Sequence, residues 1–576
     1  MSEQQHAPQA EKVIPLTEPP KEGEGEKGPS KSALKKAAKE KEKAEKAAAR
    51  KAAEEAQKKE AEANDISKND YGELALFGST VSSIPASTEV PWIELEELPE
   101  IFESSSGAEE SGGPHVVITT TVKNARIQSA SLAFLVLQHG YETIQGVVAK
   151  SETLSKQMVK FVGSIPSQSV VRAHVLVKKP KDPVKSCTIE NLEVHIKKLF
   201  IVSKADSQLP LQVEDAERPL PLEGQEAQTD EEGGRPVVGL STRLNNRVLD
   251  LRASQNLAIF DIMDGVERLF KEFLQARGFR NRHTPKLIGA ASEGGANAFE
   301  VKYFEEKAFL AQSPQLYKQM LIASGIQRVM EVGPVFRAEN SNTARHLTEF
   351  TGLDLEMEIK EHYHEAITLL EELMLYIFNG LKERYKRETD LLRKDYHVDE
   401  FKLPEAGKVP RLNFAEGIAM LREDGIEIAD FEDLSTPHEK RLGALVLKKY
   451  GTDFYVLDKF PLAVRPFYTM PSNYNPEDPN SGYSNSYDFF MRGQEIMSGA
   501  QRIHQAEFLA KRMREHVTPV DPESPGLKHY VNAFKYGCRE HAGGGIGLER
   551  IVMLWLGVPN IRLASLFPRD PGRLEP

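Results

Sequence analysis

Residues 335–358 read VFRAENSNTARHLTEFTGLDLEME, and this stretch decides how the rest of the chain is interpreted. From residue 353 onward aliphatic and acidic side chains alternate, which predicts a strand with one apolar and one acidic face. The acidic face carries Asp354, Glu356 and Glu358. Because burying an unpaired carboxylate is costly, this face must meet solvent, a metal ion or a cationic ligand. The pattern alone leaves open whether it is a solvated sheet edge or the floor of a site.

The strand predicted just before it ends in two charged residues. Arg337 and Glu339 are two positions apart, so their side chains share one face. Residues 340–345, between the two strands, are polar and mostly small, as in a loop that covers a substrate. This arrangement favours a ligand-binding site over a plain sheet edge.

Two further stretches carry residues suited to phosphate chemistry. Residues 543–550, GGGIGLER, predict a glycine-rich turn that opens an apolar helix and lets the backbone approach a phosphate or a base. Arg550 lies in this otherwise apolar helix, so its guanidinium needs an anion or an aromatic partner. Residues 488–502 predict a hairpin that turns at Gly493, in which Asp488 and Glu495 could hold Mg²⁺ together.

Composition limits the class of protein. A length of 576 residues predicts two or three domains. The sequence contains no run of ~18 apolar residues, so we expect no transmembrane helix. The first 30 residues lack the apolar core of a secretory signal. Cys187 and Cys538 are the only cysteines, which excludes a disulfide framework and a cysteine-based zinc site and favours the cytosol. We therefore expect a cytoplasmic protein without a membrane partner.

Charge is distributed unevenly along the chain. The net charge is −12, yet residues 31–51 hold nine basic and three acidic residues. The segment is rich in alanine, which predicts a helix, but it has no apolar stripe with which to join a core. It is either a solubilising extension or an arm that binds nucleic acid by releasing phosphate counterions.

A β-rich segment follows, between residues 115 and 205. Five strands are predicted at 115–122, 132–137, 143–148, 170–177 and 192–202, with a helix at 154–161 after the third. This order is typical of an OB-fold barrel, which binds single-stranded nucleic acid by stacking bases on aromatic rings. Phe134 and Gln145 are candidate base contacts, although periodicity alone favours a core position for Phe134.

The chain is thus expected to have an α+β fold in four parts. These are a Lys-rich extension and linker at 1–112, an OB-fold domain at 113–205, an acidic, proline-rich hinge at 206–236 and a catalytic domain at 237–576.

Several motifs together resemble those of class II aminoacyl-tRNA synthetases. Pro285, the block from Phe336 to Phe350 and the run from Gly545 to Arg550 resemble motifs 1, 2 and 3 of that class, in order. The runs Ser292-Glu293-Gly-Gly295, Gln312-Ser-Pro-Gln315-Leu-Tyr-Lys318 and Ser498-Gly-Ala-Gln-Arg502 are similar to those of cytoplasmic aspartyl-tRNA synthetases of fungal type. The resemblance covers essentially the whole chain.

The resemblance implies a fold, an activity and partners. The fold is an OB barrel for the anticodon, a hinge and a catalytic domain with an antiparallel sheet flanked by helices. The activity is an aspartate–tRNA ligase that activates L-aspartate with ATP, releases pyrophosphate and transfers the aspartyl group to the 3′ end of tRNA(Asp). The enzyme is expected to use Mg²⁺ and to form a homodimer, with Pro285 at the interface.

The resemblance also assigns roles to residues. The catalytic residues are Arg337, Glu495 and Arg550. The ATP-binding residues are Arg337, Ala338, Glu339, Arg345, His346, Leu347, Phe350, Glu495, Gly545, Ile546, Gly547, Leu548 and Arg550. The aspartate-binding residues are Glu293, Gln315, Lys318, Arg337, Asp354, Ser498 and Arg502. The metal ligands are Asp488 and Glu495, and the tRNA-binding residues are Lys31, Lys35, Lys36, Lys39, Gln128, Phe134 and Gln145.

Within these roles, two expectations are specific enough to check against geometry. Lys318 and Arg502 should both grip the side-chain carboxylate of aspartate, which would discriminate against asparagine. Strict alternation would place Glu495 and Ser498 on opposite faces of a flat strand, so a β-bulge is expected between them if both serve the site.

The sequence departs from the family at one tRNA contact and leaves two other functions open. Gln128 stands in Arg126-Ile-Gln128-Ser129, where family members often have Arg-Gln-Gln-Gly. One alternative function is an asparaginyl-tRNA synthetase, against which Lys318 and Arg502 argue. The other is a non-catalytic tRNA-binding paralogue, against which the retained motif arginines and acidic residues argue.

Overall fold

The computed structural model forms two compact units, residues 1–205 and 206–576, which are described separately. The structure describes residues 64–74, 90–105, 113–221, 237–292, 297–341, 343–396 and 398–576. The Lys-rich segment and Glu293 lie outside these residues. No helix within the described ranges is long and apolar enough to cross a membrane.

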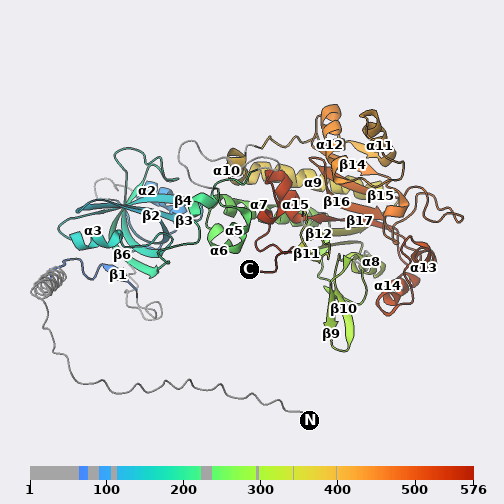
Figure 1. Cartoon of the computed structure of the whole chain (residues 1–576), viewed down its shortest axis with the longest axis horizontal. Coiled ribbons are helices and arrows are strands. Elements are labelled where there is room, and N and C mark those ends of the chain that lie inside the picture. The colour runs from blue at the N-terminus through green and yellow to red at the C-terminus, as the bar shows by residue number, and fades with distance from the viewer. Residues whose placement is uncertain are drawn as a thin grey trace, which may run out of the picture. The chain divides into compact units, whose positions relative to one another are not determined.

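The first unit is a closed five-stranded barrel (Figure 1). Its elements are β2 (His115–Ser129), β3 (Leu132–His139), β4 (Glu142–Ala149), α3 (Lys156–Val162), β5 (Val170–Lys178) and β6 (Glu193–Ser203). The barrel closes because β6 pairs in parallel with β4 and antiparallel with β5. The predicted order, with one helix after the third strand, is confirmed.

Alternation along the barrel strands separates the core from the outer surface. In β3, Ala133, Leu135 and Leu137 are buried in the barrel core, whereas Phe134 and Val136 between them are half-buried on the outside. The segment interpreted as linker also contributes. β1 (Tyr71–Glu73) pairs with β6, and α2 (Leu98–Ser104) places Leu98 and Phe102 in the same core.

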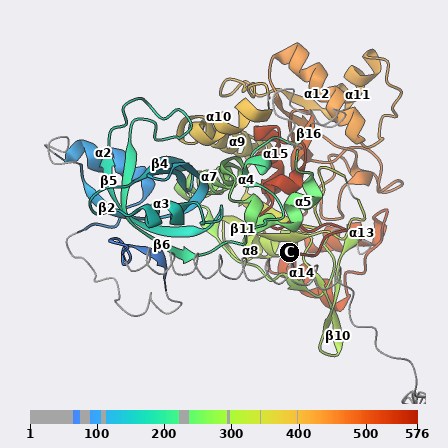
Figure 2. The ribbon, with the colours of Figure 1, turned by 60° about the vertical axis from the view of Figure 1, so that its left-hand side comes forward.

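The second unit is built on an eight-stranded, mostly antiparallel sheet in the order β13-β14-β15-β16-β17-β12-β11-β7. The strands are β7 (Arg280–Asn281), β11 (Arg328–Phe336), β12 (Glu349–Glu358), β13 (Arg411–Asn413), β14 (Phe454–Asp458), β15 (Ser486–Met491), β16 (Gln494–Gln501) and β17 (His541–Gly547). A separate hairpin of β9 (Glu300–Tyr303) and β10 (Glu306–Leu310) projects from this unit (Figures 1 and 2).

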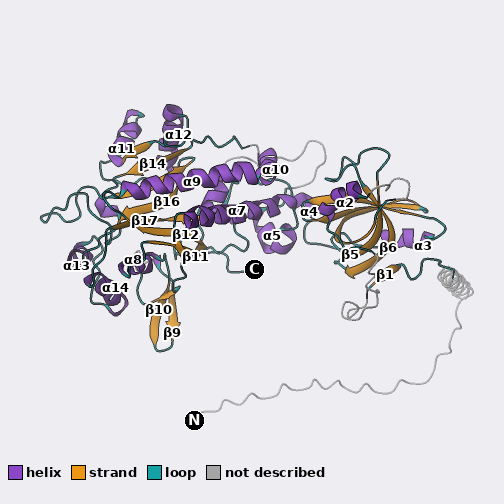
Figure 3. Cartoon of the chain, turned by 180° about the vertical axis from the view of Figure 1, so that it is seen from behind, coloured by secondary structure: helices purple, strands orange, loops and turns teal. Residues whose placement is uncertain are grey.

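Helices pack against this sheet. Figure 3 shows the long helices α7 (Ser254–Ala276) and α9 (His364–Arg384) lying side by side. With α15 (Leu548–Leu556), which contacts both α7 and β12, they bury an apolar layer. Elsewhere, α8 (Gln315–Ala323) contacts β11 and β12 and packs on α14 (Pro525–Lys535), which contacts α13 (Ala506–Glu515). The other α-helices described in this unit are α4 (Val213–Ala216), α5 (Leu240–Asn245), α6 (Arg247–Asp250), α10 (Lys386–Tyr396), α11 (Phe414–Glu423) and α12 (Thr436–Tyr450).

The glycine-rich stretch corrects one prediction. Residues 543–547 do not form a turn; they belong to β17, an interior strand paired with both β12 and β16. A Cβ atom on Gly543 would lie 2.2 Å from the carbonyl oxygen of Leu355 and 2.5 Å from Oε2 of Glu356. Glycine is therefore required because the neighbouring strand approaches too closely for a side chain. The predicted helix that follows is present as α15.

Candidate active site

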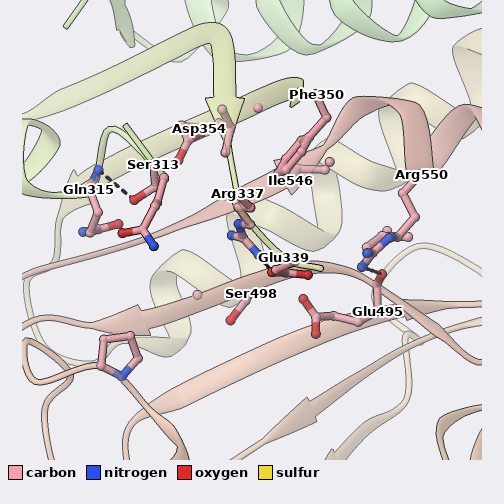
Figure 4. Close-up of a pocket in the computed structure, with 18 of the residues that line it drawn as sticks. Ser313, Gln315, Arg337, Glu339, Phe350, Asp354, Glu495, Ser498, Ile546 and Arg550 are labelled. Atoms are coloured by element: carbon pink, nitrogen blue, oxygen red, sulfur yellow. Dashed lines mark hydrogen bonds and ion pairs between the residues drawn. The ribbon is translucent and has the colours of Figure 1, made fainter. Parts of the chain in front are cut away.

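The central strands of the large sheet form the floor of a pocket of about 380 Å³, a size typical of small-molecule sites. Figure 4 shows side chains from segments far apart in the sequence converging on it. Most of the predicted ATP and aspartate residues line this pocket: Gln315, Arg337, Glu339, Arg345, His346, Leu347, Phe350, Asp354, Glu495, Ser498, Arg502, Gly545, Ile546, Gly547 and Arg550.

The carboxylate face of β12 lies on this floor. Strand register places Asp354 opposite Gly545, Gly545 opposite Ser498, and Ser498 opposite Asp488. A Cβ on Gly545 would be 3.0 Å from Oδ1 of Asp354, so glycine at this position leaves room beside that carboxylate. Asp354 of the acidic face lines the pocket, Glu356 is fully buried and Glu358 pairs with Arg539, so this face is not a solvated edge.

The expected bulge in β16 is present. Phe489 pairs with Met497 and Phe490 with Glu495, so Ile496 is the extra residue. The bulge shifts the alternation by one, and Glu495 and Ser498 both line the pocket. The predicted turn of the hairpin at Gly493 is confirmed, and both Arg492 and Gly493 have positive φ there.

Buried ion pairs lie at the amino-acid end of the site. Nζ of Lys318 is 2.9 Å from Oδ1 of Asp354 and 3.7 Å from Oε2 of Glu356, and Nε of Arg502 is 3.1 Å from Oε1 of Glu356. Burial opposes ionisation of Glu356, but Arg502 and Lys318 outweigh it and lower its pKa. Burial raises the pKa of Asp354, although Lys318 opposes the shift. Arg502 lines the pocket, whereas Lys318 lies beneath it.

Cationic and aromatic side chains lie at the other end. The guanidinium carbon of Arg337 is 5.5 Å from the centroid of the Phe350 ring, and Nη1 of Arg337 is 4.0 Å from Oε1 of Glu339. Nη1 of Arg550 donates to the carbonyl oxygen of Glu495 at 2.9 Å. Burial and the nearby charge of Arg550 lower the pKa of His346. This end has the positive charge and the flat ring that a nucleotide requires.

The two predicted metal ligands differ in their surroundings. Glu495 lines the pocket, whereas Asp488 lies below the lining and binds Nη2 of Arg465 through Oδ2 at 2.7 Å. Oδ1 of Asp488 is buried and has no hydrogen-bond partner. Burial raises the pKa of Asp488 to about 7; Arg465 opposes this and the charge of Glu495 adds to it. Two neighbouring carboxylates with one unpartnered oxygen fit a divalent cation completed by phosphate oxygens. The described residues contain no group of three or more His, Cys, Asp or Glu placed to hold a metal ion.

Sequence reasoning missed three charged residues of the site. Arg465 binds Ser498 as well as Asp488, Glu439 binds Arg345 at 2.9 Å, and Glu549 accepts from the backbone N–H of Thr351 at 2.9 Å. Only Arg465 carries a signal in the sequence, because it is a lone cation in the mostly apolar run 460–470, as Arg550 is in its helix. The partners of the other two are far away along the chain.

Several predicted residues lie elsewhere. Ala338 and Leu548 adjoin the pocket residues in sequence but do not line it. Pro285 is exposed just after β7, and the dimer contact expected of it stays a prediction. Glu293 and the lysines Lys31, Lys35, Lys36 and Lys39 are outside the described ranges.

The predicted anticodon contacts lie on the barrel. Phe134 and Gln145 share the outer face of β3 and β4, because Phe134 pairs with Val147 and Gln145 with Val136. The guanidinium of Arg126 is 5.6 Å from the Phe134 ring centroid. Gln128 is exposed at a bulge in β2. Phe134 is therefore not a core residue, contrary to what periodicity alone favoured.

Comparison with known proteins gives a consistent result. Residues 239–571 match the family described as tRNA synthetases class II (D, K and N). A cytoplasmic aspartate–tRNA ligase of Caenorhabditis elegans is 51% identical over 443 residues, covering 77% of this chain and 81% of the relative. The aspartyl-tRNA synthetase structure from Entamoeba histolytica is similar with a TM-score of 0.74 and 43% identity, covering 88% of this chain and 96% of that one. An asparaginyl-tRNA synthetase from Pyrococcus horikoshii, complexed with asparaginyl-adenylate, has a TM-score of 0.70 and 26% identity, covering 84% and 99%.

Proposed function

This chain belongs to the cytoplasmic aspartate–tRNA ligases of the class II tRNA synthetases, and from that premise we propose how its pocket performs the two steps. In the first step L-aspartate and ATP form aspartyl-adenylate and pyrophosphate. In the second the aspartyl group passes to the 3′ end of tRNA(Asp). Enzymes of this class use ATP and a divalent metal ion. The cytoplasm is the compartment named for the relatives.

The observation that carries the assignment of the amino-acid end is the buried array of Lys318, Asp354, Glu356 and Arg502. Asp354 reaches the pocket and meets the α-ammonium of the substrate. Arg502, supported from below by Lys318, meets the side-chain carboxylate. A carboxylate gains more from this cation than a neutral amide does, which favours aspartate over asparagine. Gln315, Ser498 and Glu293 complete the orientation of the substrate.

Arg337 stands where the two substrates meet. The α-carboxylate of aspartate attacks the α-phosphorus of ATP, a new O–P bond forms, and the bond to the bridging oxygen breaks as pyrophosphate leaves. No general base is required because the nucleophile is already ionised. Arg337 stabilises the charge that develops on the phosphorus, so catalysis consists mainly of positioning and electrostatics.

The other residues hold ATP. Phe350 and Arg550 enclose the adenine, Glu339 contacts its edge, and His346 and Arg550 reach the γ-phosphate. The low pKa of His346 keeps its ring neutral, so that it donates a hydrogen bond without adding to the surrounding positive charge. Asp488 and Glu495 would hold Mg²⁺, which supplies charge neutralisation for the phosphates when bound.

We assign tRNA binding to the barrel and to the N-terminal segment. Phe134 presents a half-buried ring next to Arg126, on the same outer face as Gln145, and this surface is suited to stacking and reading a base. The lysines of residues 31–51 add electrostatic attraction. We also infer a homodimer with Pro285 at the interface.

The test is ATP–pyrophosphate exchange on the purified chain. The wild type should exchange with L-aspartate and far less with L-asparagine; the reverse preference would assign the chain to the asparaginyl enzymes. Arg337→Ala should lower the exchange rate by about 100-fold or more, because it removes a charge aligned with the transition state. Unchanged exchange in Arg337→Ala would contradict the assignment of this pocket.

A further inference from the structure

A chain of buried hydrogen bonds runs beneath the amino-acid end of the pocket. It starts at the carbonyl oxygen of Arg539 and passes through His541 of β17, Gln319 and Gln315 of α8, to Glu356 of β12. The side chains of His541, Gln319 and Glu356 are fully buried. Among the described residues, the side-chain hydrogen bonds of His541 and Gln319 reach Gln315 as their one pocket residue, and the backbone carbonyl of His541 accepts from the N–H of Arg502.

His541 determines which group donates and which accepts in each of these hydrogen bonds. Its Nδ1 is 2.8 Å from the carbonyl oxygen of Arg539, which can only accept, so Nδ1 carries the proton. Burial lowers the pKa of His541 and keeps the ring neutral. Nε2 must therefore be an acceptor, and the group 3.2 Å from it is the amide nitrogen of Gln319.

The donors and acceptors of the next two hydrogen bonds, toward the pocket, follow from this assignment. With its nitrogen turned to His541, Gln319 presents Oε1 to the amide nitrogen of Gln315 at 3.3 Å. The Gln315 nitrogen also donates to Oε2 of Glu356 at 3.3 Å. Both amide hydrogens of Gln315 are then used inside the protein, so its carbonyl oxygen is the part that remains for a ligand. Gln315 lines the pocket (Figure 4).

We propose that His541 is a positioning residue for recognition of the α-ammonium group of the substrate. By accepting from Gln319 it fixes the orientation of the Gln315 amide, so that an acceptor and not a donor faces the bound amino acid. A reversed Gln315 would present N–H groups to the ammonium and repel it. This proposal rests on the proposed function and adds a buried residue that touches neither substrate.

Three variants separate this role from simple packing. His541→Asn keeps a donor for the Arg539 carbonyl but is too short to accept from Gln319. His541→Gln can place an oxygen where Nε2 lies and should restore the acceptor. Tyr530→Phe is the matched control, because the Tyr530 hydroxyl also donates to Oε1 of Gln319, at 3.0 Å, without determining the direction of the chain.

The readouts are the KM for L-aspartate and the inhibition constant of succinate, which lacks the amino group. His541→Asn should raise the aspartate KM about tenfold, the loss of one hydrogen bond to a charged group, while the succinate constant and kcat stay within about twofold. His541→Gln and Tyr530→Phe should stay within about threefold of the wild type for both ligands. Should His541→Asn fail to fold, Gln319→Met is assayed in the same way and the same selective loss is expected.

An equal rise in the aspartate KM and in the succinate inhibition constant would overturn the proposal, because a merely loosened pocket weakens the binding of both ligands. An unchanged aspartate KM in His541→Asn would overturn it as well. A wild type without aspartate-dependent exchange would instead refute the proposed function, so the two failures are distinguishable.

Discussion

Arg465 binds the carboxylate of Asp488, with Nη2 2.7 Å from Oδ2, and also donates to Oγ of Ser498 at 2.9 Å. A carboxylate assigned to the metal site and a serine assigned to the amino-acid site are therefore joined by one mostly buried guanidinium. None of the motifs that carry the resemblance includes this arginine.

Replacing Arg465 with Met should lower the free energy of unfolding by about 3–5 kcal/mol, because Asp488 would be left buried without its cation. The double variant Arg465→Met with Asp488→Asn should recover most of this loss. Urea unfolding of the full chain measures both. Arg268→Met, which breaks an exposed pair with Asp264, is the control and should cost no more than about 0.5 kcal/mol. A double variant no more stable than the single one would contradict this account.

Gly543→Ala should be strongly disruptive and Gly547→Ala should not. The new methyl group at position 543 would clash with the carbonyl oxygen of Leu355 and with the Glu356 side chain. β17 cannot move aside, because it is paired with β12 on one side and with β16 on the other. We expect a loss of about 1–3 kcal/mol in stability, together with a higher aspartate KM as Glu356 shifts against Arg502. At Gly547 the nearest atom to a new Cβ is Cβ of Arg550, an ordinary separation of 3.7 Å. Equal unfolding midpoints for the two variants would be evidence against the close strand approach.

Glu549 should make stability depend on pH. Burial raises its pKa from 4.5 to about 7, so the folded chain holds this proton more tightly than the unfolded chain does. The stability gained from that proton is complete below about pH 4.5 and is lost as the pH rises through about 7. The Glu549→Gln variant has no titrating group at this position. Its free energy of unfolding should therefore rise relative to that of the wild type by up to about 3 kcal/mol between pH 5 and pH 8. Urea unfolding at each pH measures the difference, and a difference independent of pH would show that Glu549 does not titrate in this range.

Deleting residues 1–64 should weaken tRNA binding and leave aspartate-dependent exchange unchanged. For every lysine that binds a phosphate, its removal should reduce the slope of log affinity against log salt concentration by about 0.7–0.9. Changing Lys31, Lys35, Lys36 and Lys39 to Gln in the full chain is the matched variant and should have a smaller effect in the same direction. Equal tRNA affinity of the intact and shortened chains at low salt would disprove a role for this segment.

Local patterns in the sequence were sufficient for much of the fold. Alternation along β12, the turn at Gly493 and the strand order of the barrel follow from short-range rules on burial and backbone conformation. The bulge at Ile496 followed from requiring two nearby side chains, Glu495 and Ser498, on one face. The motif residues of the resemblance then identified most of the pocket lining.

The remaining features depend on interactions between distant parts of the chain. The glycines at 543–547 read as a turn by themselves, and only the approach of β12 explains why they form a strand.

The sequence by itself determined the fold class from periodicity, and it determined the family and many of the pocket residues from motifs read in order. It did not identify Arg465, Glu439 and Glu549, which line the pocket as well. Only the tertiary structure decided which charges neutralise each other, because the partners are far apart in the sequence. Lys318 and Asp354 are 36 positions apart, and Arg502 and Glu356 are 146 positions apart. The direction of the hydrogen bonds from His541 to Gln315 was decided there too, because it depends on which donor and acceptor meet once the strands and helices are packed.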